Sequence, residues 1–463
     1  MLIEQIIIYG SIFLLCFVVI WFYLRKQKKT TQATVAKIEK AKQEGVFEPV
    51  SLHPVIDLGT CIKSGACMDA CPEKDIIGIV NGRATLVNAA ECVGHGACFH
   101  ACPVEAISLV IGTEKRGVDL PHVSTEYESN IQGVYIAGEL GGMGLIKNSI
   151  EQGEAAVNAI AKSLTKRGGT SYDLVIIGAG PAGISASLTA KKHGLSFLTL
   201  EQDSLGGTVA NFPRSKIVMT APVDLPLYGK IKLFDTSKSE LLAIWNDALS
   251  KNGISIRENT KVEGIRSSQQ MRAAQTIQEN TRVQGIQIDG DVFYVHTNRG
   301  EEFVTKTVLL AIGRRGSPRK LGVPGEGMEK VAYRLLEPEN ISGKRVVVVG
   351  GGDSAIEAAV SLAQQNSVIL SYRGDAFARV KPKNRERLET AMQDGKVDLK
   401  LKSNLVNIDN ELVELAMEEN GGKQAVGNDL VYIFAGGELP TQFLEKVGIQ
   451  ITKRFGYTMK KHR

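Results

Sequence analysis

The chain has 463 residues, 43% of them hydrophobic and 23% charged, which is typical of folded proteins and excludes disorder over the whole length. This length predicts roughly three domains. The net charge is only +5 and the basic residues form no stripe with interleaved aromatic residues, so nucleic-acid binding is not expected. Six of the seven cysteines lie between Cys61 and Cys102. This distribution is typical of a metal site and not of a disulfide scaffold.

An uncharged apolar run of 19 residues covers positions 6–24. At about 1.5 Å per residue it is long enough to cross a bilayer. A cleaved signal peptide is the alternative, but it needs basic residues before the run. Here Glu4 precedes the run, and the basic residues follow it, at Arg25, Lys26, Lys28 and Lys29. We therefore expect a single-pass anchor in the inner (cytoplasmic) membrane over residues 1–25, with the soluble domains on the cytoplasmic side. A polar linker over 26–52 follows.

The cysteines form an internal duplication. Residues 61–72 read CIKSGACMDACP and residues 92–103 read CVGHGACFHACP, so equivalent cysteines are 31 positions apart. This pattern resembles the bacterial two-cluster ferredoxin motif, C-x2-C-x2-C-x3-C-P. The resemblance covers about residues 53–112 and implies an α+β ferredoxin-like domain there.

Each half of the duplication departs from the ferredoxin motif at its second cysteine, which is replaced by Ser64 and by His95. In that family the last cysteine of each motif binds the other cluster. The resemblance therefore implies one ligand set of Cys61, Cys67 and Cys102, and a second set of Cys71, Cys92 and Cys98. Three thiolates suit a 3Fe-4S cluster, or a 4Fe-4S cluster whose last iron binds His, Ser or water. His95 is a candidate ligand or a hydrogen-bond donor to a cluster sulfur, and zinc or empty sites remain alternatives.

A first dinucleotide motif occupies residues 172–201. A β-branched strand leads into Gly178-x-Gly180-Pro181-x-Gly183, and a helix and a second strand follow, ending at Glu201. Glycines at these positions permit a tight turn and bring the backbone close to a pyrophosphate at a helix N-terminus. Glu201 suits a ribose with a free 2′-hydroxyl. The order of strand, glycines, helix, strand and acid is specific, and it predicts an FAD site.

A second motif repeats this layout at residues 344–373, with Gly350-x-Gly352, followed by Asp353 and Ser354. The residue 23 positions after the first glycine is now Arg373 instead of an acid. A guanidinium suits a 2′-phosphate, which it can bind with two hydrogen bonds. This site is therefore predicted to bind NADP, with NAD as the open alternative.

Together these motifs resemble the flavoprotein reductases of the thioredoxin-reductase type and their bacillithiol-disulfide-reductase-like relatives. The resemblance covers about residues 131–450. It rests on GGGDSAIEAA at 350–359, YRGDAF at 372–377, LLAIG at 309–313 and Gly206-Gly207-Thr208. It implies FAD contacts at Gly207 and Gly313. The chain has no cysteine after Cys102, so it lacks the redox-active C-x-x-C of the family's disulfide reductases and no catalytic residue is assigned.

The flavin segment with which this family ends is missing near the C-terminus, and a similar segment, GVYIAGELGGMG, lies earlier, at 133–144. We predict a circular permutation that places Gly138 and Glu139 at the FAD. The predicted divisions are: 1–25 anchor, 26–52 linker, 53–112 ferredoxin-like domain, 113–170 permuted segment of the FAD domain, 171–335 FAD domain, 336–437 NAD(P) domain and 438–463 C-terminal tail.

The predicted fold is an α/β two-dinucleotide-binding flavoprotein with an N-terminal ferredoxin-like domain and one transmembrane helix. The expected function is a membrane-anchored NAD(P)H-dependent oxidoreductase, which passes electrons between NADPH, FAD and two iron–sulfur clusters and a redox partner. That partner would be a quinone, a cytochrome or a ferredoxin. Two alternatives remain: a flavin reductase of a soluble disulfide-type molecule with structural clusters, and a non-enzymatic membrane redox sensor. A homodimer is common in this class of reductase.

Overall fold

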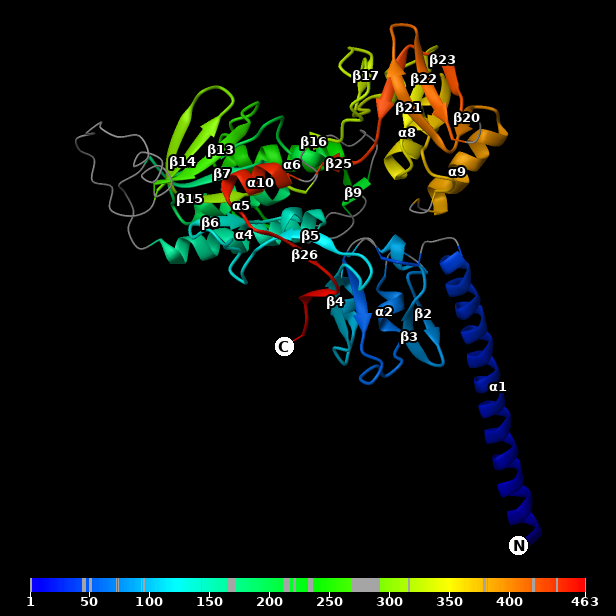
Figure 1. Cartoon of the computed structure of the whole chain (residues 1–463). Coiled ribbons are helices and arrows are strands. Elements are labelled where there is room, and N and C mark those ends of the chain that lie inside the picture. The colour runs from blue at the N-terminus through cyan, green and yellow to red at the C-terminus, as the bar shows by residue number, and fades with distance from the viewer. Residues whose placement is uncertain are drawn as a thin grey trace. The chain divides into compact units, whose positions relative to one another are not determined.

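The computed structural model describes most of the chain and divides it into two compact units (Figure 1). Unit 1 comprises Met1–Val118 together with Arg454–Arg463, and unit 2 comprises Asp119–Lys453. The residues described are 2–43, 47–49, 52–71, 73, 75–92, 94, 96–142, 144–164, 171–210, 217–219, 222–231, 236–268, 292–314, 317–377, 380, 382–418, 421–438 and 440–462.

Unit 1 begins with one long helix, α1 (Leu2–Gln43), which continues through most of the predicted linker. Of the helices in the described part of the chain, α1 is the one long and apolar enough to cross a membrane, and none of its apolar window is buried. The polar half of α1 is partly covered, since Thr34 and Ala41 are buried. That half packs beside the hairpin of β2 (Ile77–Val80) and β3 (Arg83–Leu86), whereas the N-terminal half extends away from it (Figure 1).

The rest of unit 1 is a small α+β domain. Its three-stranded antiparallel sheet has the order β1 (His53–Ile56), β4 (Ile107–Ile111) and β27 (Tyr457–Lys460). Two short helices, α2 (Ala66–Asp69) and α3 (Ala97–Ala101), and a 3-10 turn, η1 (Ala89–Glu91), carry or adjoin the cysteine motifs.

The chain's last residues belong to this domain. After β27, the ring of His462 stacks on Phe99 with 3.7 Å between ring centroids. Lys460 also lies over that ring, at 5.2 Å. The segment predicted only as a tail thus forms the third strand of the unit 1 sheet and covers the residue that follows Cys98.

Unit 2 contains a six-stranded sheet of order β13, β14, β15, β7, β8, with β6 also paired to β15. Strands β6, β15, β7 and β8 are parallel, and β13 to β15 form an antiparallel meander. Its elements are β6 (Val134–Ile136), η2 (Glu139–Gly141), α4 (Ile146–Ser163), β7 (Tyr172–Ile177), α5 (Pro181–Lys192), β8 (Phe197–Leu200), η3 (Gly207–Val209), α6 (Lys238–Lys251), β13 (Val262–Ser267), β14 (Phe293–Thr297), β15 (Glu302–Leu310) and α10 (Thr441–Val447). Short pairs complete it: β5 (Val118–Pro121) with β26 (Ile451–Arg454), β9 (Ile217–Met219) with β12 (Thr236–Ser237), and β10 (Val223–Leu225) with β11 (Gly229–Ile231).

The segment that precedes the first glycine motif is built into this sheet. Strand β6 pairs in parallel with β15, with Leu309 opposite Tyr135. Helix α4 packs on α5 so closely that a side chain at Gly153 would collide with the carbonyl of Ala182. Ser185 Oγ donates a hydrogen bond to the Ile150 carbonyl across the same contact, at 2.8 Å. Residues 134–163 therefore form part of the first dinucleotide fold although they precede its glycine motif.

A second parallel sheet, of order β17, β24, β18, β19, β20, lies in residues 331–433. Its elements are β17 (Val331–Ala332), η4 (Pro338–Asn340), β18 (Arg345–Val349), α8 (Asp353–Leu362), β19 (Ser367–Ser371), α9 (Pro382–Gln393), β20 (Val397–Lys400) and β24 (Leu430–Ile433). A meander, β21 (Ser403–Ile408), β22 (Leu412–Met417) and β23 (Lys423–Gly427), precedes β24, and the short strands β16 (Ser317–Pro318) and β25 (Gly437–Glu438) pair with each other. Strand β17 joins this sheet although it precedes the predicted domain start at residue 336.

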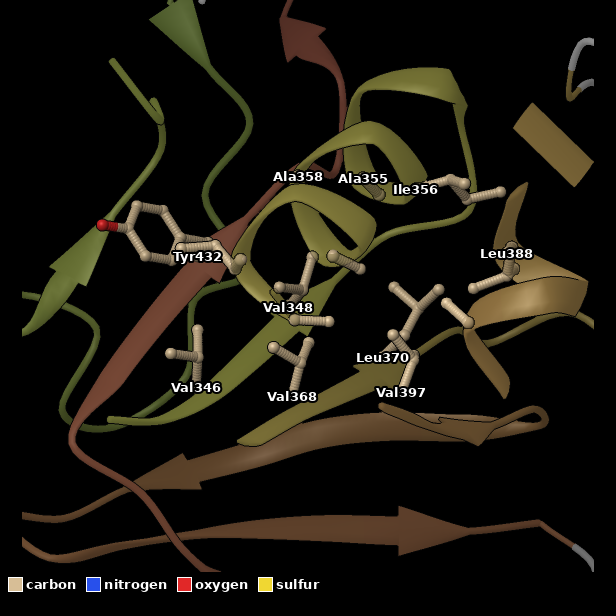
Figure 2. Packing of buried hydrophobic residues seen from close by; sticks show 14 of the residues in the cluster. Val346, Val348, Ala355, Ile356, Ala358, Val368, Leu370, Leu388, Val397 and Tyr432 are labelled. Atoms are coloured by element: carbon tan, nitrogen blue, oxygen red, sulfur yellow. The ribbon is translucent and has the colours of Figure 1, made fainter. Parts of the chain in front are cut away.

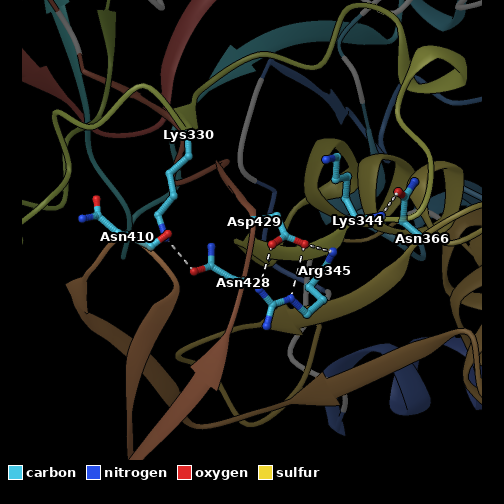
Figure 3. A network of polar contacts seen from close by, with 7 residues as sticks. All are labelled: Lys330, Lys344, Arg345, Asn366, Asn410, Asn428 and Asp429. Carbon is cyan, nitrogen blue, oxygen red and sulfur yellow. Dashed lines mark hydrogen bonds and ion pairs between the residues drawn. The ribbon is translucent and has the colours of Figure 1, made fainter.

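The core of this second sheet combines branched aliphatic residues with alanines of α8 and with Tyr432 (Figure 2). Val348 and Leu370 are fully buried and pack below Ile356 of α8. An ion pair lies at the start of β18, at the end of that strand away from the glycine motif. Arg345, at the start of β18, binds Asp429 at 2.7 Å, and the neighbouring Lys330 donates to Asn428 at 2.8 Å (Figure 3).

Helix α10 occupies part of the segment predicted as a tail. Its Leu444 and Val447, with Ile449 after it, are buried in the core that also contains Val134 and Val308 of the first sheet. Asn130 Nδ2 donates to the Gly448 carbonyl, at 3.0 Å, which ties α10 to the segment before β6. Residues 441–449 thus complete the first dinucleotide fold.

Candidate cofactor sites

The two cysteine motifs have the same backbone structure. Gly65 and Gly96 precede α2 and α3 with φ of +76° and +73°, in the left-handed region that glycine adopts without strain. The carbonyl of each glycine accepts two N–H groups of the following turn, from Met68 and Asp69 in one case and from Phe99 and His100 in the other. The sequence duplication is therefore also a structural duplication.

The first predicted ligand set comes together. Cys61, Cys67 and Cys102 line one cavity, and Ser64 lies at the same cavity. Burial raises the pKa of the Cys67 thiol, and negative charge on Cys61 and Cys102 would raise it further. Residues from both cysteine motifs thus meet at one site, as the crossed ferredoxin pairing implies.

The second set also comes together. Burial raises the pKa of Cys98 to about 12, with further contributions from charge on Cys92 and Cys71. Burial likewise raises the pKa of Cys92 to about 11, with Cys71 again a neighbour. Cys71 Sγ donates to the Glu73 carbonyl at 3.0 Å. His95, the other predicted participant, lies outside the described residues.

Thiols are the ligands that iron–sulfur clusters require, so the donor chemistry of both sets fits such a group. Within the described ranges, no three His, Cys, Asp or Glu side chains lie close enough together to hold one metal ion. Thiols with raised pKa values are protonated at neutral pH, and metal binding requires thiolates. An iron–sulfur cluster would therefore displace protons from Cys67 in the first set and from Cys71, Cys92 and Cys98 in the second.

The backbone packs closely around the first glycine motif. Gly178 has φ of +103°, and a side chain there would lie 2.5 Å from the Ala311 carbonyl. A side chain at Gly183 would collide with the Gly178 carbonyl. Nothing lies within 4 Å of the side-chain position of Gly180, which caps α5 before Pro181. This leaves the N-terminus of α5 open beside the turn, as a pyrophosphate would require.

Glu201 follows the end of β8 and is only 4% exposed. Its carboxylate accepts N–H groups from Ala179 at 2.7 Å and from Asp203 at 3.0 Å. Burial raises its pKa, and these two hydrogen bonds oppose that effect. The carboxylate is therefore fixed directly above the glycine turn, with further lone pairs available to ribose hydroxyls.

Other predicted flavin residues lie around the same turn. Gly207 lies beside Gly180, since its side-chain position is 3.3 Å from the Gly180 Cα. Gly138 has φ of +88° and its N–H donates to the buried Gln152 at 2.9 Å, so Gln152 is a structural partner that the sequence analysis missed. Glu139 follows in η2, and Gly313 has φ of +66° with no atom within 4 Å of its side-chain position.

The second glycine motif has the same geometry at its first position. A side chain at Gly350 would lie 2.6 Å from the Phe434 carbonyl, and Gly352 caps α8 with open space around it. Asp353 and Ser354 begin α8. Asn384 of α9, buried at 6% exposure, donates to Asp353 at 2.7 Å and to Glu357 at 3.0 Å. Asn384 was not predictable from the sequence, because a single asparagine outside any motif has no local signature.

Strand register corrects the predicted equivalence of Arg373 and Glu201. Ile177 pairs with Leu200 in the first sheet, and Val349 pairs with Ser371 in the second. The residue equivalent to Glu201 is therefore Tyr372, and Arg373 is one position further along. The Tyr372 ring lies on Gly351, contacts Gly374, and stacks on Phe377 with 5.3 Å between centroids. Arg373 is exposed.

With this geometry established, comparison with known proteins defines the class. The chain matches the pyridine nucleotide-disulphide oxidoreductase family over residues 175–462, and it belongs to that family. Residues 53–103 match a 4Fe-4S dicluster domain. The chain is thus an NAD(P)H-dependent flavoprotein oxidoreductase fused to an iron–sulfur domain.

Two curated relatives agree with this class. The chain is 30% identical to the bacilliredoxin reductase Bdr of Bacillus subtilis over 293 residues, which are 61% of this chain and 82% of that protein. It is 27% identical over 206 residues to the ferredoxin–NADP reductase of Ignicoccus hospitalis, covering 44% of this chain and 57% of that one. The solved bacillithiol disulfide reductase Bdr (YpdA) of Staphylococcus aureus is 21% identical, with 61% of this chain and 84% of that chain covered and a TM-score of 0.49.

Proposed function

We propose that this protein is a membrane-anchored oxidoreductase that passes electrons between NADPH, FAD and two iron–sulfur clusters and a membrane or protein redox partner. The observation that carries the proposal is the meeting of two separate thiol sets, Cys61/Cys67/Cys102 and Cys71/Cys92/Cys98, within one domain of a nicotinamide-dependent flavoprotein. A bound FAD would exchange a hydride with the nicotinamide and single electrons with iron–sulfur centres.

Separate groups of residues would bind the FAD and the nicotinamide nucleotide. Gly178, Gly180 and Gly183 would leave room for the FAD pyrophosphate, and Glu201 would hold its ribose. The permuted segment would supply Gly138 and Glu139 to the same site. Gly350 and Gly352 would bind the nicotinamide nucleotide at the start of α8. No pair of cysteines is available for disulfide chemistry in this half of the chain, because none follows Cys102.

Arg373 is proposed to select NADPH. Tyr372 follows β19 at the position equivalent to Glu201, so this position has no carboxylate that would repel a 2′-phosphate. We expect Arg373→Ala to raise the KM for NADPH by about ten-fold and to leave the KM for NADH nearly unchanged. A parallel loss with both nucleotides would contradict this role.

The apolar half of α1 is proposed as the membrane anchor. Residues 8–24 are exposed in the folded chain, and Arg25, Lys26, Lys28 and Lys29 follow them. The proposed location is the cytoplasmic membrane, with both units on the cytoplasmic side.

Cysteine variants test the function. Cys67→Ser and Cys98→Ser each remove one thiol from one set, and Cys16→Ser, in α1, is the matched control. We expect NADPH-dependent reduction of cytochrome c, a one-electron protein acceptor, to fall about ten-fold or more in the first two variants. Flavin reduction by NADPH should persist in all three. Unchanged cytochrome c reduction would instead favour a reductase of a soluble two-electron acceptor with structural clusters.

A further inference from the structure

A continuous series of contacts joins the polar half of α1 to the β2–β3 hairpin. Lys37 binds Asp75 at 2.6 Å, and the methyl group of Thr34 lies against Gly78. Thr31 Oγ1 accepts the Asn81 N–H at 3.1 Å. Contacts nearer the N-terminus of α1 therefore lie nearer the tip of the hairpin, which is the Asn81–Gly82 turn.

The last contact in this series is close to the end of the apolar run. The side-chain position of Gly82 is 2.8 Å from Gln27 Nε2 and 2.8 Å from Lys63 Nζ. Gln27 is three residues after Leu24, the last apolar residue of the run, which is about 4.5 Å along a helix. If the run spans a bilayer, the hairpin tip and Lys63 lie at the level of the lipid headgroups.

Lys63 belongs to a loop, residues 57–65, that we call the Cys61 loop. Together with Ile62, Ser64 and Gly65 of this loop, Lys63 lines the cavity of the first thiol set. Two large apolar side chains of the loop are exposed, Leu58 at 46% and Ile62 at 59%. Exposed aliphatic side chains beside a lysine are typical of segments that rest in the membrane interface.

We propose that the Cys61 loop rests on the bilayer surface with Leu58 and Ile62 among the lipid headgroups, and that electrons are therefore exchanged with a lipid-soluble quinone at the first thiol set. This inference rests on the proposed function and names the partner. The overall reaction is NADPH + H⁺ + quinone → NADP⁺ + quinol. NADPH supplies two electrons and one proton, and the solvent supplies the second proton.

The contact with lipid can be tested without reference to activity. A photo-crosslinking amino acid is placed at Leu58 or Ile62 of the full chain in liposomes of phosphatidylethanolamine and phosphatidylglycerol. The matched control is Phe455, which is 53% exposed and precedes β27, at the sheet edge opposite β1. Mass spectrometry should find lipid adducts at positions 58 and 62 and none at 455. Adducts to protein only, or equal lipid adducts at all three positions, would overturn the proposal.

A functional arm separates this inference from the proposed function. In the liposomes, Leu58→Glu should lower quinone reduction by NADPH about ten-fold, equivalent to ~1.4 kcal/mol, because a charge would lift the loop from the interface. Phe455→Glu should not, and cytochrome c reduction should be unchanged in both variants. Normal quinone reduction in Leu58→Glu would overturn the inference and leave the proposed function standing. Loss of NADPH-dependent reduction of every acceptor in the unaltered protein would instead remove the proposed function.

Discussion

The ring of Tyr372 lies directly on Gly351, at the position where Glu201 lies above Ala179 in the first dinucleotide fold. An aromatic face has thus replaced a carboxylate at the second site. The same ring contacts Gly374, with 2.7 Å from the side-chain position of Gly374 to the ring. This contact explains why residue 374 is glycine and not a second arginine.

Gly351→Ala tests this packing. The added methyl group would collide with the Tyr372 ring, so we expect a loss of about 1–3 kcal/mol in the free energy of unfolding of the nicotinamide domain. Gly352→Ala is the control, because Gly352 has φ of −106° and no atom within 4 Å of its side-chain position. Denaturant unfolding monitored by circular dichroism measures both. Equal stability of the two variants would show that the ring does not lie on Gly351.

The contact between α4 and α5 gives a test of the permuted segment. Gly153→Ala would force α4 away from the Ala182 carbonyl, so we expect a loss of about 1–3 kcal/mol in stability, together with lower FAD retention. Gly141→Ala, where no atom lies within 4 Å, should retain FAD. The ratio of flavin to protein absorbance after purification reports the outcome. Full FAD retention in Gly153→Ala would contradict a role for α4 in the flavin site.

Ser64 lies at the first cavity with only three thiols, so Ser64→Cys would supply a fourth. We expect the 3Fe-4S EPR signal of the oxidised protein to disappear in this variant, a four-iron signal to appear on reduction, and the iron content to rise. The EPR signal of the second set is an internal control, because Ser64 lies at the cavity of the first set. An unchanged EPR spectrum and iron content would show that Ser64 does not face an iron site.

Acid sensitivity is predicted for the Arg345–Asp429 pair. The Arg345 guanidinium holds the pKa of Asp429 at about 2, below its usual value of 3.8. A lowered pKa means that this stabilisation is present above about pH 4 and is lost as the pH falls toward 2. Asp429→Asn should therefore show a smaller fall in thermal midpoint between pH 4 and pH 2 than the unaltered protein. Asp394→Asn, which removes an exposed ion pair with Lys396, is the control. If the thermal midpoints of both variants fall as much as that of the unaltered protein, the Arg345–Asp429 pair does not contribute to the acid sensitivity.

Local patterns predicted much of this structure. The two glycine turns and the doubled cysteine motif depend on residues within about 30 positions of each other, and such patterns are visible in a sequence. Counting from the first glycine failed at Arg373, because α8 is two residues shorter than α5 and β19 is one residue longer than β8, so the equivalent position comes one residue earlier. Only strand pairing identifies Tyr372 as the equivalent of Glu201.

The C-terminal segment was not predictable for a different reason. Strand β27 has four residues and pairs with β4, so that Thr458 lies opposite Val110. The stacking of His462 on Phe99 likewise joins residues 363 positions apart. A short strand with a distant partner has no local signature, since its stability comes from the sheet that it joins.

The central claim is electron transfer from NADPH to the cysteine domain. The most direct test is an anaerobic titration of the full chain in detergent with NADPH, monitored by visible absorbance and low-temperature EPR. We predict that bleaching of the flavin band is followed by a change in iron–sulfur signals as more NADPH is added. Bleaching of the flavin with unchanged iron signals, or the absence of iron from the purified protein, would contradict the claim.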